Sequence, residues 1–406
     1  MRIIFVNLHT NEFLVKTASK YIFKQSVAIK HRYLIDYLLN ETDIEVCSYI
    51  NRNGTSIAHN LPQPLMRILS ACRFLESKWV FRKNGLAGKI KIIKDPSDIR
   101  HDDIVMIYQL FADQCSELAK VDAFKVVSML HFHGSQSNSD AIRRCNPNML
   151  IAESNLKKYS AIFQKYYSWY QKDILVHPFV FEERFQEKRQ YGERKNRAFS
   201  TGTITYKKHP EFIDVYGNPC DQPIRKYVKD HQEELKGMID CYNSDYSEDA
   251  NKKMEVTTKD NKLMRLVKGF YYKFFASQQK SYYSFNMVEK FNEYKMCLIG
   301  EEILGVPGIG FVEGMACGCA YIGHNIGYYE DYGLKEGIHY IGYDGTPEDL
   351  IDKVKYYQQP EHQKELECIA KEGCEYVRTY FNGSKAAETL VTRILDSQLM
   401  RNNNIQ

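Results

Sequence analysis

The chain has 406 residues, which exceeds one ordinary hydrophobic core and predicts two domains of roughly 200 residues each. Hydrophobic residues at 44% and charged residues at 26% are typical of a globular protein, and a net charge of +4 is too small for a dedicated nucleic-acid binder. The 11 cysteines are odd in number and scattered, which argues against a secreted disulfide framework and favours reduced thiols in the cytoplasm.

Short apolar runs with polar ends alternate with helical segments along the first half of the chain. Strands are predicted at RIIFVNLH, DIEVCSYI, DDIVMIYQL and FKVVSMLHFHG, and a strand followed by a helix at MLIAESNLKKYSAIF. This alternation is typical of an α/β domain with a parallel sheet, which we place at residues 1–182.

A charged segment, residues 183–196, is interpreted as the linker to a second α/β series at residues 197–385. That series has predicted strands at RAFSTGTI, YKMCLIG and HYIGYDG, and a helix with Thr346 as its N-cap and Pro347 at its first position. Ligands of such folds bind at the carboxyl ends of the parallel strands, so we expect a site in the crevice between the two halves.

The segment GIGFVEGMACGCAYIG, residues 308–323, contains a glycine-rich turn, a short helix and a strand. Gly308 and Gly310 permit close approach of the backbone to a ligand, and the helix that begins near Phe311 offers free N–H groups to an anion such as a diphosphate. Glu313 either accepts hydrogen bonds from sugar hydroxyls or only complements the helix dipole. From these residues alone, an anion site and a packed corner are equally supported.

Two other interpretations of this segment have less support. A dinucleotide fingerprint normally follows the first strand of its domain and needs an acid after the next strand, but CAYIGHN ends in His and Asn. Cys317 and Cys319 lack a second ligand pair at a metal-binding spacing, so we expect them to pack in the core and expect no metal.

The sequence GFVEGMACGCAYIG resembles the signature G-F-x-x-x-E-A-M-A-C-G-x-P-V-I of GT-B glycosyltransferases that use nucleotide sugars. The following residues resemble the C-terminal part of that group, particularly its CgeB-like branch, and MLIAESNLKKYSAIF with ILVHPFVFEERF resembles the end of its first domain. The resemblance implies two Rossmann-like domains with parallel sheets facing each other across a cleft. It also implies a last helix, residues 386–406, that packs back on the first domain.

The resemblance also assigns a donor site. Glu313 would bind the donor ribose, and the turn would hold the diphosphate through Gly308, Ile309, Gly310 and Phe311. The family has another Glu eight residues earlier, which binds the transferred sugar, but this position is Gly305 here. Glu301 and Glu302 are candidates to replace it, with a solvated loop as the alternative.

Basic residues follow the first strand of the second domain in GTITYKKHPEF. By resemblance, Gly202 belongs to the donor site, and Lys207 and Lys208 neutralise the leaving diphosphate; the alternative is a solvent-facing lysine pair. A cation stabilises the leaving group without a metal, and the sequence has no Asp-x-Asp, so a metal-independent reaction is expected.

Three histidines follow predicted strands of the first domain. By resemblance, His131 contacts the transferred sugar. His133 is a candidate for deprotonating the acceptor or contacting phosphate, because histidine titrates near neutral pH. His9 is a candidate for the acceptor side, with capping of a helix as the alternative.

Two stretches combine basic and aromatic residues, at residues 64–94 and 262–280. Both suit an anionic membrane surface, although a core-facing amphipathic helix is the more common explanation. No run approaches the roughly 18 apolar residues that span a bilayer, and no nucleic-acid-binding module is recognised. We therefore expect a cytoplasmic protein, with a peripheral location at the inner face of the plasma membrane as an option.

These features predict a metal-independent GT-B glycosyltransferase that moves a sugar from a UDP- or GDP-linked donor to a saccharide or lipid-linked saccharide. The resemblance suggests bacterial surface polysaccharide synthesis, and no cofactor besides the donor substrate is expected. One alternative is an inverting, fucosyltransferase-like enzyme that uses a GDP-sugar, since NEYKMCLIGEE resembles that group's Y-K-F segment. The others are a non-catalytic nucleotide-sugar- or glycan-binding protein and, last, an NAD(P)-dependent oxidoreductase.

Overall fold

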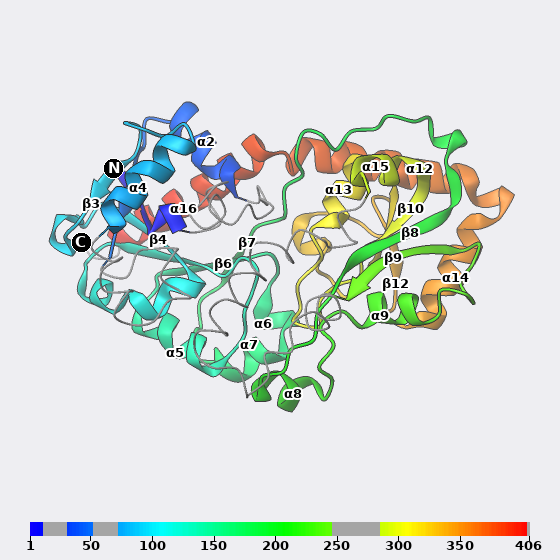
Figure 1. Cartoon of the computed structure of the whole chain (residues 1–406), viewed down its shortest axis with the longest axis horizontal. Helices are drawn as coiled ribbons and strands as arrows, with labels where there is room; N and C mark the ends of the chain where they lie inside the picture. Colours follow the sequence, from blue (N-terminus) through cyan, green and yellow to red (C-terminus); the bar gives the residue numbers. More distant parts are fainter. Residues whose placement is uncertain (11–30, 52–71, 246–284, 404–406) are drawn as a thin grey trace, which may run out of the picture. The chain divides into compact units, whose positions relative to one another are not determined.

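The computed structural model describes residues 1–10, 31–51, 72–245 and 285–403. These residues form two α/β units, each built on its own sheet (Figure 1). Unit 1 comprises Met1–Ala152, Tyr166–Leu175 and Ala386–Gln406, and unit 2 comprises Glu153–Lys165 and Val176–Lys385. The prediction of two α/β series is confirmed.

The sheet of unit 1 has seven strands in the order β3-β2-β1-β4-β5-β6-β7, and the pairs from β3 to β6 are parallel. Its strands are β1 (Arg2–Val6), β2 (Glu45–Tyr49), β3 (Lys91–Ile93), β4 (Ile104–Tyr108), β5 (Phe124–Ser128), β6 (Met149–Ala152) and β7 (Ile174–Val176). The central strands β1 and β4 are buried along their whole length, which explains their continuous apolar sequences.

Helices cover both faces of parallel sheets of this kind. In unit 1 they are α2 (Arg32–Asn40), α4 (Arg73–Lys83), α5 (Gln136–Arg144) and α16 (Gly383–Asn403), with the short 3₁₀ helices η1 (Leu8–Thr10), η3 (Pro96–Asp98), η4 (Gln109–Gln114) and η5 (Ser116–Lys120). The last helix, α16, packs Leu390, Val391 and Ile394 into the same core as Ile3 and Val46. The C-terminal end of the chain therefore contributes to the core of unit 1.

The sheet of unit 2 has five parallel strands in the order β12-β11-β10-β8-β9. They are β8 (Lys195–Ile204), β9 (Ile239–Asp245), β10 (Tyr294–Leu298), β11 (Ala320–His324) and β12 (Ile341–Tyr343). The helices are α6 (Leu156–Tyr159), α7 (Ala161–Tyr166), α8 (Pro210–Tyr216), α9 (Pro223–Asp230), α12 (Met287–Glu293), α13 (Gly310–Ala316), α14 (Pro347–Gln358) and α15 (Gln363–Tyr380). Short 3₁₀ helices complete the unit: η6 (Tyr191–Glu193), η9 (Glu330–Tyr332) and η10 (Pro360–His362). As predicted, α14 begins with Thr346 as N-cap, whose hydroxyl accepts a hydrogen bond from the Asp349 N–H.

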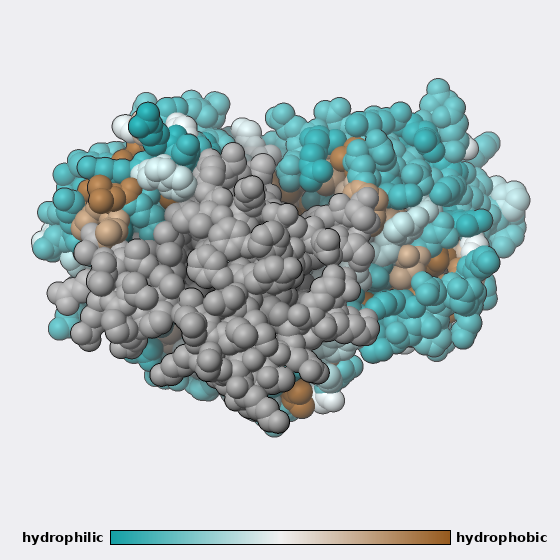
Figure 2. All heavy atoms as spheres, viewed as in Figure 1, coloured by the Kyte–Doolittle hydropathy of each residue, from teal (hydrophilic) through white to brown (hydrophobic). Residues whose placement is uncertain are grey.

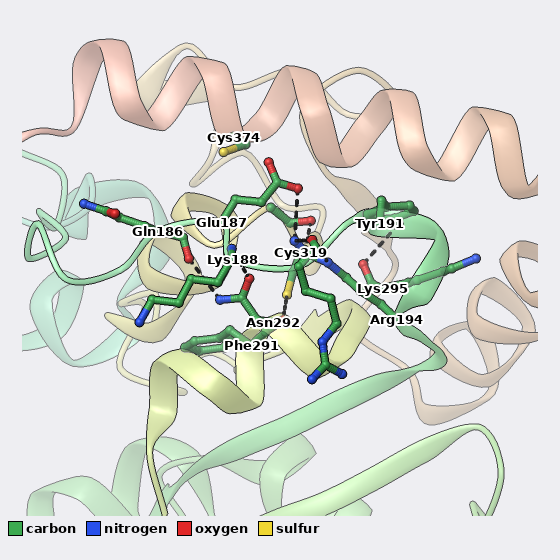
Figure 3. Close-up of polar contacts among 12 residues, drawn as sticks. Gln186, Glu187, Lys188, Tyr191, Arg194, Phe291, Asn292, Lys295, Cys319 and Cys374 are labelled. Carbon is green, nitrogen blue, oxygen red and sulfur yellow. Dashed lines mark hydrogen bonds and ion pairs between the residues drawn. The ribbon is translucent and has the colours of Figure 1, made fainter.

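The charged segment interpreted as a linker, residues 183–196, belongs to unit 2 and forms polar contacts with other residues of that unit (Figure 3). The backbone N–H of Lys188 donates to Asn292 Oδ1 at 2.6 Å, and the Tyr191 hydroxyl donates to the Lys295 carbonyl at 3.1 Å. Arg194, near the end of this segment, is buried. The polar composition thus reflects these contacts as well as exposure to water. No helix of the described ranges is long and apolar enough to cross a membrane.

Candidate functional site

The carboxyl ends of β8 and β10 form the topological switch point of unit 2. From β8 the chain continues to β9 on one side of the sheet, whereas β10 lies on the other side of β8 and leads to β11 and β12. The connections therefore leave the two strands in opposite directions, and open α/β sheets bind ligands at the carboxyl ends of strands at such a point. The residues that follow β8 and β10 are accordingly the first candidates for a site.

The glycines of GIGFVEG let α13 lie close to β10. A Cβ atom at Gly314 would lie 2.5 Å from Cys297 Sγ, and one at Gly310 would lie 3.0 Å from Ile299 Cδ1. Phe311 is fully buried and stacks on Tyr332 with ring centroids 6.1 Å apart. Much of the glycine spacing in this motif is therefore a packing requirement, and Phe311 is a core residue through its side chain.

Two arginines hold the C-terminal end of α13. Arg194 Nη1 donates to the Gly318 carbonyl at 2.9 Å, and Arg378 Nη2 donates to the Ala316 carbonyl at 2.6 Å. Figure 3 shows Arg194 beside Glu187, whose carboxylate lies 3.0 Å from Arg194 Nη2. Cations are favourable at this end of a helix because they satisfy its free carbonyls. They keep α13 in place, with the half-buried Glu313 in its first turn.

The cysteines of this segment are buried. Cys317 and Cys319 have almost no exposed surface, and Cys319 Sγ donates to the Phe291 carbonyl at 2.9 Å. Burial raises the pKa of the Cys317 thiol well above its usual range. The expected core position of both residues is confirmed, and the described ranges hold no group of three or more side chains suited to a metal ion.

The most notable residue at the switch point is Arg225, which lies in the first turn of α9. Its Nε donates to the carbonyls of Ile299 at 2.5 Å and Gly300 at 3.1 Å, and its Nη2 donates to Gly300 at 2.8 Å. Its Nη1 donates to the Thr203 carbonyl at 2.9 Å. Because Thr203 belongs to β8 and Ile299 directly follows β10, the guanidinium joins the carboxyl ends of both strands.

Three glycines surround the Arg225 side chain. A Cβ atom at Gly308 would lie 2.6 Å from Nη2, one at Gly202 would lie 2.7 Å from Nε, and one at Gly300 would lie 3.0 Å from Cγ. Two predicted donor-site glycines, Gly202 and Gly308, therefore lack side chains because the guanidinium occupies the space. The sequence analysis did not identify Arg225. A cation in the first turn of a helix is unfavourable because it opposes the helix dipole, and this unusual position is a signal that could have identified it.

The two lysines predicted to neutralise the leaving group differ in their surroundings. Lys208 is exposed, whereas Lys207 Nζ lies 3.3 Å from Asp221 Oδ2, and Asp221 is 1% exposed. Burial raises the pKa of Asp221, while Lys207 acts in the opposite direction. Asp221 Oδ1 has no hydrogen-bond partner among the described residues. The structure thus adds Asp221 to the candidate site.

Residue 305, where the resembling family has a Glu that binds the transferred sugar, has no room for a side chain in this structure. Gly305 has φ +85°, and a Cβ atom would lie 2.6 Å from the Tyr159 carbonyl oxygen. Of the two proposed replacements, Glu302 is half-buried in a turn closed by its N–H and the Val306 carbonyl at 2.9 Å. Glu301 is buried among tyrosines.

The Glu301 carboxylate is the centre of a hydrogen-bonded cluster. It accepts from the hydroxyls of Tyr321 at 3.1 Å, Tyr329 at 2.5 Å and Tyr343 at 3.3 Å, and from the His324 N–H at 2.9 Å. Burial, followed by the Glu301 charge, raises the pKa of all three tyrosines. These contacts explain Glu301 as a structural residue that joins β10, β11 and β12.

In unit 1, Gln109 organises the loop that carries two of the predicted histidines. Its Nε2 donates to the carbonyls of Met129 at 3.1 Å, Leu130 at 3.0 Å and His131 at 2.9 Å, and its Oε1 accepts from the His133 N–H at 3.1 Å. His131 is held at φ +55°, which is unusual for a residue other than glycine. Such strain is often found at functional sites.

The histidines of unit 1 lie at different strand ends. The His131 ring is 5.5 Å from that of His31, His133 is exposed, and His9 is fully buried in η1 after β1. Strand β4 separates β1 from β5 in the sheet, so His9 and His131 follow strands that are not neighbours.

The comparisons with known proteins concern the fold. No protein-family model and no curated protein matches the sequence. Among solved structures, the chain is similar to sucrose-phosphate synthase from Thermosynechococcus elongatus, with a TM-score of 0.53 and 12% identity over 99% of each chain. It is also similar to HepE from Anabaena in complex with UDP, with a TM-score of 0.50 and 10% identity over 98% of this chain and 100% of that one. The chain has the GT-B glycosyltransferase fold. The predicted GT-B fold class is therefore confirmed.

Proposed function

We propose that this protein is a glycosyltransferase that moves a sugar from a nucleotide diphosphate donor to a saccharide acceptor. The observation that carries the proposal is the set of residues at the switch point of the second GT-B sheet. Basic side chains and the Gly308–Gly310 turn meet there at the ends of β8 and β10. The fold is shared with HepE, which was crystallised with UDP, and with sucrose-phosphate synthase.

The donor would bind to unit 2. Glu313 is half-buried in the first turn of α13, where its carboxylate is suited to hydrogen bonds from the ribose hydroxyls. The N–H groups of the turn and the nearby cations would bind the diphosphate. Lys207 and Lys208 would stabilise the leaving group, so that no metal is required. Glu302 remains the candidate for the transferred sugar, since Gly305 has no side chain.

The acceptor would bind to unit 1. His131, in its constrained backbone conformation, is the candidate for contact with the transferred sugar, and the exposed His133 is the candidate base or phosphate ligand. The full burial of His9 favours a structural role over contact with the acceptor. A lipid-linked saccharide, as used in bacterial surface polysaccharide synthesis, is the acceptor class we propose.

One surface of unit 1 supports a peripheral membrane location. Leu75 and Trp79 on α4 are 69% and 38% exposed, and the exposed cations Lys78, Arg82 and Lys83 lie on the same helix. Figure 2 shows a small hydrophobic patch in the region of α4 with hydrophilic residues around it. Such a combination suits an anionic bilayer surface. The rest of the predicted stretch before residue 72, and the second stretch at 262–280, lie outside the described residues.

The test is a thermal-shift screen of the full chain against UDP, GDP, CMP, their sugars and NADP. Stabilisation by UDP or GDP, followed by transfer of a labelled sugar to a lipid-linked acceptor, would support the proposal. Stabilisation by NADP alone would exclude it. Binding of a nucleotide sugar without hydrolysis or transfer would favour the non-catalytic alternative, and preference for GDP would favour the fucosyltransferase-like one. Activity that persists in EDTA is expected for a metal-independent enzyme.

A further inference from the structure

Three arginines are buried in the described part of the chain, and one of them differs from the other two. Arg2 and Arg194, each 4% exposed, are paired with the carboxylates of Asp103 and Glu187. Arg225 is 7% exposed, and no carboxylate lies within 4.0 Å of its guanidinium among the described residues. A buried charge is costly unless it is paired, and arginine cannot lose its proton. Arg225 therefore lacks a direct counter-charge that the other two have.

The hydrogen bonds of Arg225 leave part of its guanidinium unused. Of the five N–H groups, one each on Nε, Nη1 and Nη2 donates to backbone carbonyls of Thr203, Ile299 and Gly300. One N–H on each terminal nitrogen has no acceptor in the described ranges. A guanidinium N–H is a strong donor to a phosphate oxygen, so the two unused donors favour a phosphate ligand.

Lys125 shows what a purely structural buried cation looks like in the same protein. Its Nζ donates to three carbonyls, those of Leu118, Ala119 and Val121, at 3.3, 3.2 and 3.0 Å, which uses all of its donors. Arg225 differs, because two of its donors have no acceptor in the described ranges and require a different explanation.

The position of Arg225 indicates which ligand would use these donors. The guanidinium joins the ends of β8 and β10 at the switch point, and Gly308 of the predicted diphosphate turn lies against Nη2. Lys207 is paired with the buried carboxylate of Asp221, so its charge is partly neutralised. Lys208 at the same edge is exposed, so Arg225 is the buried cation here that has no carboxylate within ion-pair distance among the described residues.

We infer that Arg225 binds the diphosphate of the nucleotide sugar through the two N–H groups that the backbone carbonyls leave free. The inference rests on the proposed function and assigns to Arg225 the role of a pre-positioned phosphate ligand. It supports a nucleoside diphosphate sugar as the donor, because the turn and the guanidinium together would bind two phosphate groups, and a nucleoside monophosphate sugar has only one.

The experiment compares the affinities of the full chain for UDP and uridine, and for GDP and guanosine, by calorimetry. The variants are Arg225→Gln, which removes the charge, and Arg225→Lys, which retains the charge but not the forked donors. Both should weaken binding of the diphosphate at least tenfold and leave binding of the nucleoside unchanged. Inorganic pyrophosphate is measured in parallel and should lose affinity in the same variants. Arg197→Gln, at an exposed position at the other end of β8, is the matched control and should change neither affinity.

The outcomes separate the inference from the proposed function. If Arg225→Gln binds UDP and uridine, or GDP and guanosine, with the same ratio of affinities as the parent protein, the arginine is only structural and the inference fails. If both variants lose affinity for the nucleotide and for the nucleoside by the same factor, the arginine is likewise only structural and the inference fails. A parent protein that binds neither nucleotides nor pyrophosphate overturns both proposals. If the protein binds pyrophosphate through Arg225 but binds no nucleotide, the phosphate site is supported and only the proposed function is overturned.

Discussion

Lys207 and Asp221 form an ion pair beside the switch point of unit 2, with Nζ and Oδ2 3.3 Å apart, and the carboxylate is almost completely buried. The sequence places the two residues in different segments, one after β8 and one just before α9. Their contact links a predicted catalytic cation to an acid that sequence reasoning did not identify. Burial of the Asp221 carboxyl group, which Lys207 only partly offsets, makes the stability of unit 2 depend on pH.

The Asp221→Asn variant tests this dependence. Burial raises the pKa of Asp221 in the folded protein, so the carboxyl group favours folding below its unfolded pKa of roughly 3.9, and that contribution is lost as pH rises through the folded pKa. Asparagine does not titrate. The melting temperature of the variant minus that of the parent should therefore increase from pH 4 to pH 7. A difference that stays constant or decreases over this range would show that Asp221 is not destabilised by burial.

Glu313→Ala should weaken binding of the donor nucleotide by roughly ten- to a hundredfold, which corresponds to the loss of hydrogen bonds to a charged group. Calorimetry with UDP and GDP measures the effect. Glu348→Ala is the matched control, because Glu348 also lies in the first turn of a helix of unit 2, and its loss should leave affinity unchanged. Unchanged affinity in Glu313→Ala would reduce Glu313 to a residue that complements the helix dipole.

Gly305→Ala should destabilise the protein more than Gly337→Ala does. Both glycines have positive φ, +85° and +72°, so alanine costs each roughly 1 kcal/mol of backbone strain. A Cβ atom at residue 305 would also meet the Tyr159 backbone, whereas none of the described atoms lies within 4 Å at residue 337. We expect an additional cost of about 1–3 kcal/mol at residue 305, visible as a lower melting temperature. Equal effects would mean that the Tyr159 segment moves aside easily.

Replacing Leu75 and Trp79 together by serine should reduce co-sedimentation with vesicles that contain anionic lipid. The physical reason is that both side chains expose apolar surface beside the cations of α4. The control replaces Leu399 and Met400 by serine, since they are also exposed on a helix of unit 1. Binding that does not depend on anionic lipid, or that responds equally to both double variants, would contradict the membrane proposal.

Local sequence patterns predicted many of the strands, although not β3, β7 or β9. The buried strands β1 and β4 appear as continuous apolar runs, and Thr346 and Pro347 mark the start of α14, because these signals depend on residues within one strand or one helical turn. Interactions between distant segments were not accessible in this way. The charged composition of residues 183–196 does not reveal that Arg194 holds the end of α13.

By itself, the sequence determined the alternation of strands and helices, the two-part α/β organisation and the glycine-rich turn before α13. The tertiary structure decided why the glycines are there, since Gly308 and Gly202 leave space for Arg225, and why residue 305 cannot be a glutamate. The physical reason is the order of the sheet. Because β10 lies beside β8, residues that are far apart in the chain meet at the carboxyl edge of this sheet. Which side chains fit there, and which charges lie close together, is therefore decided only once the strands have paired.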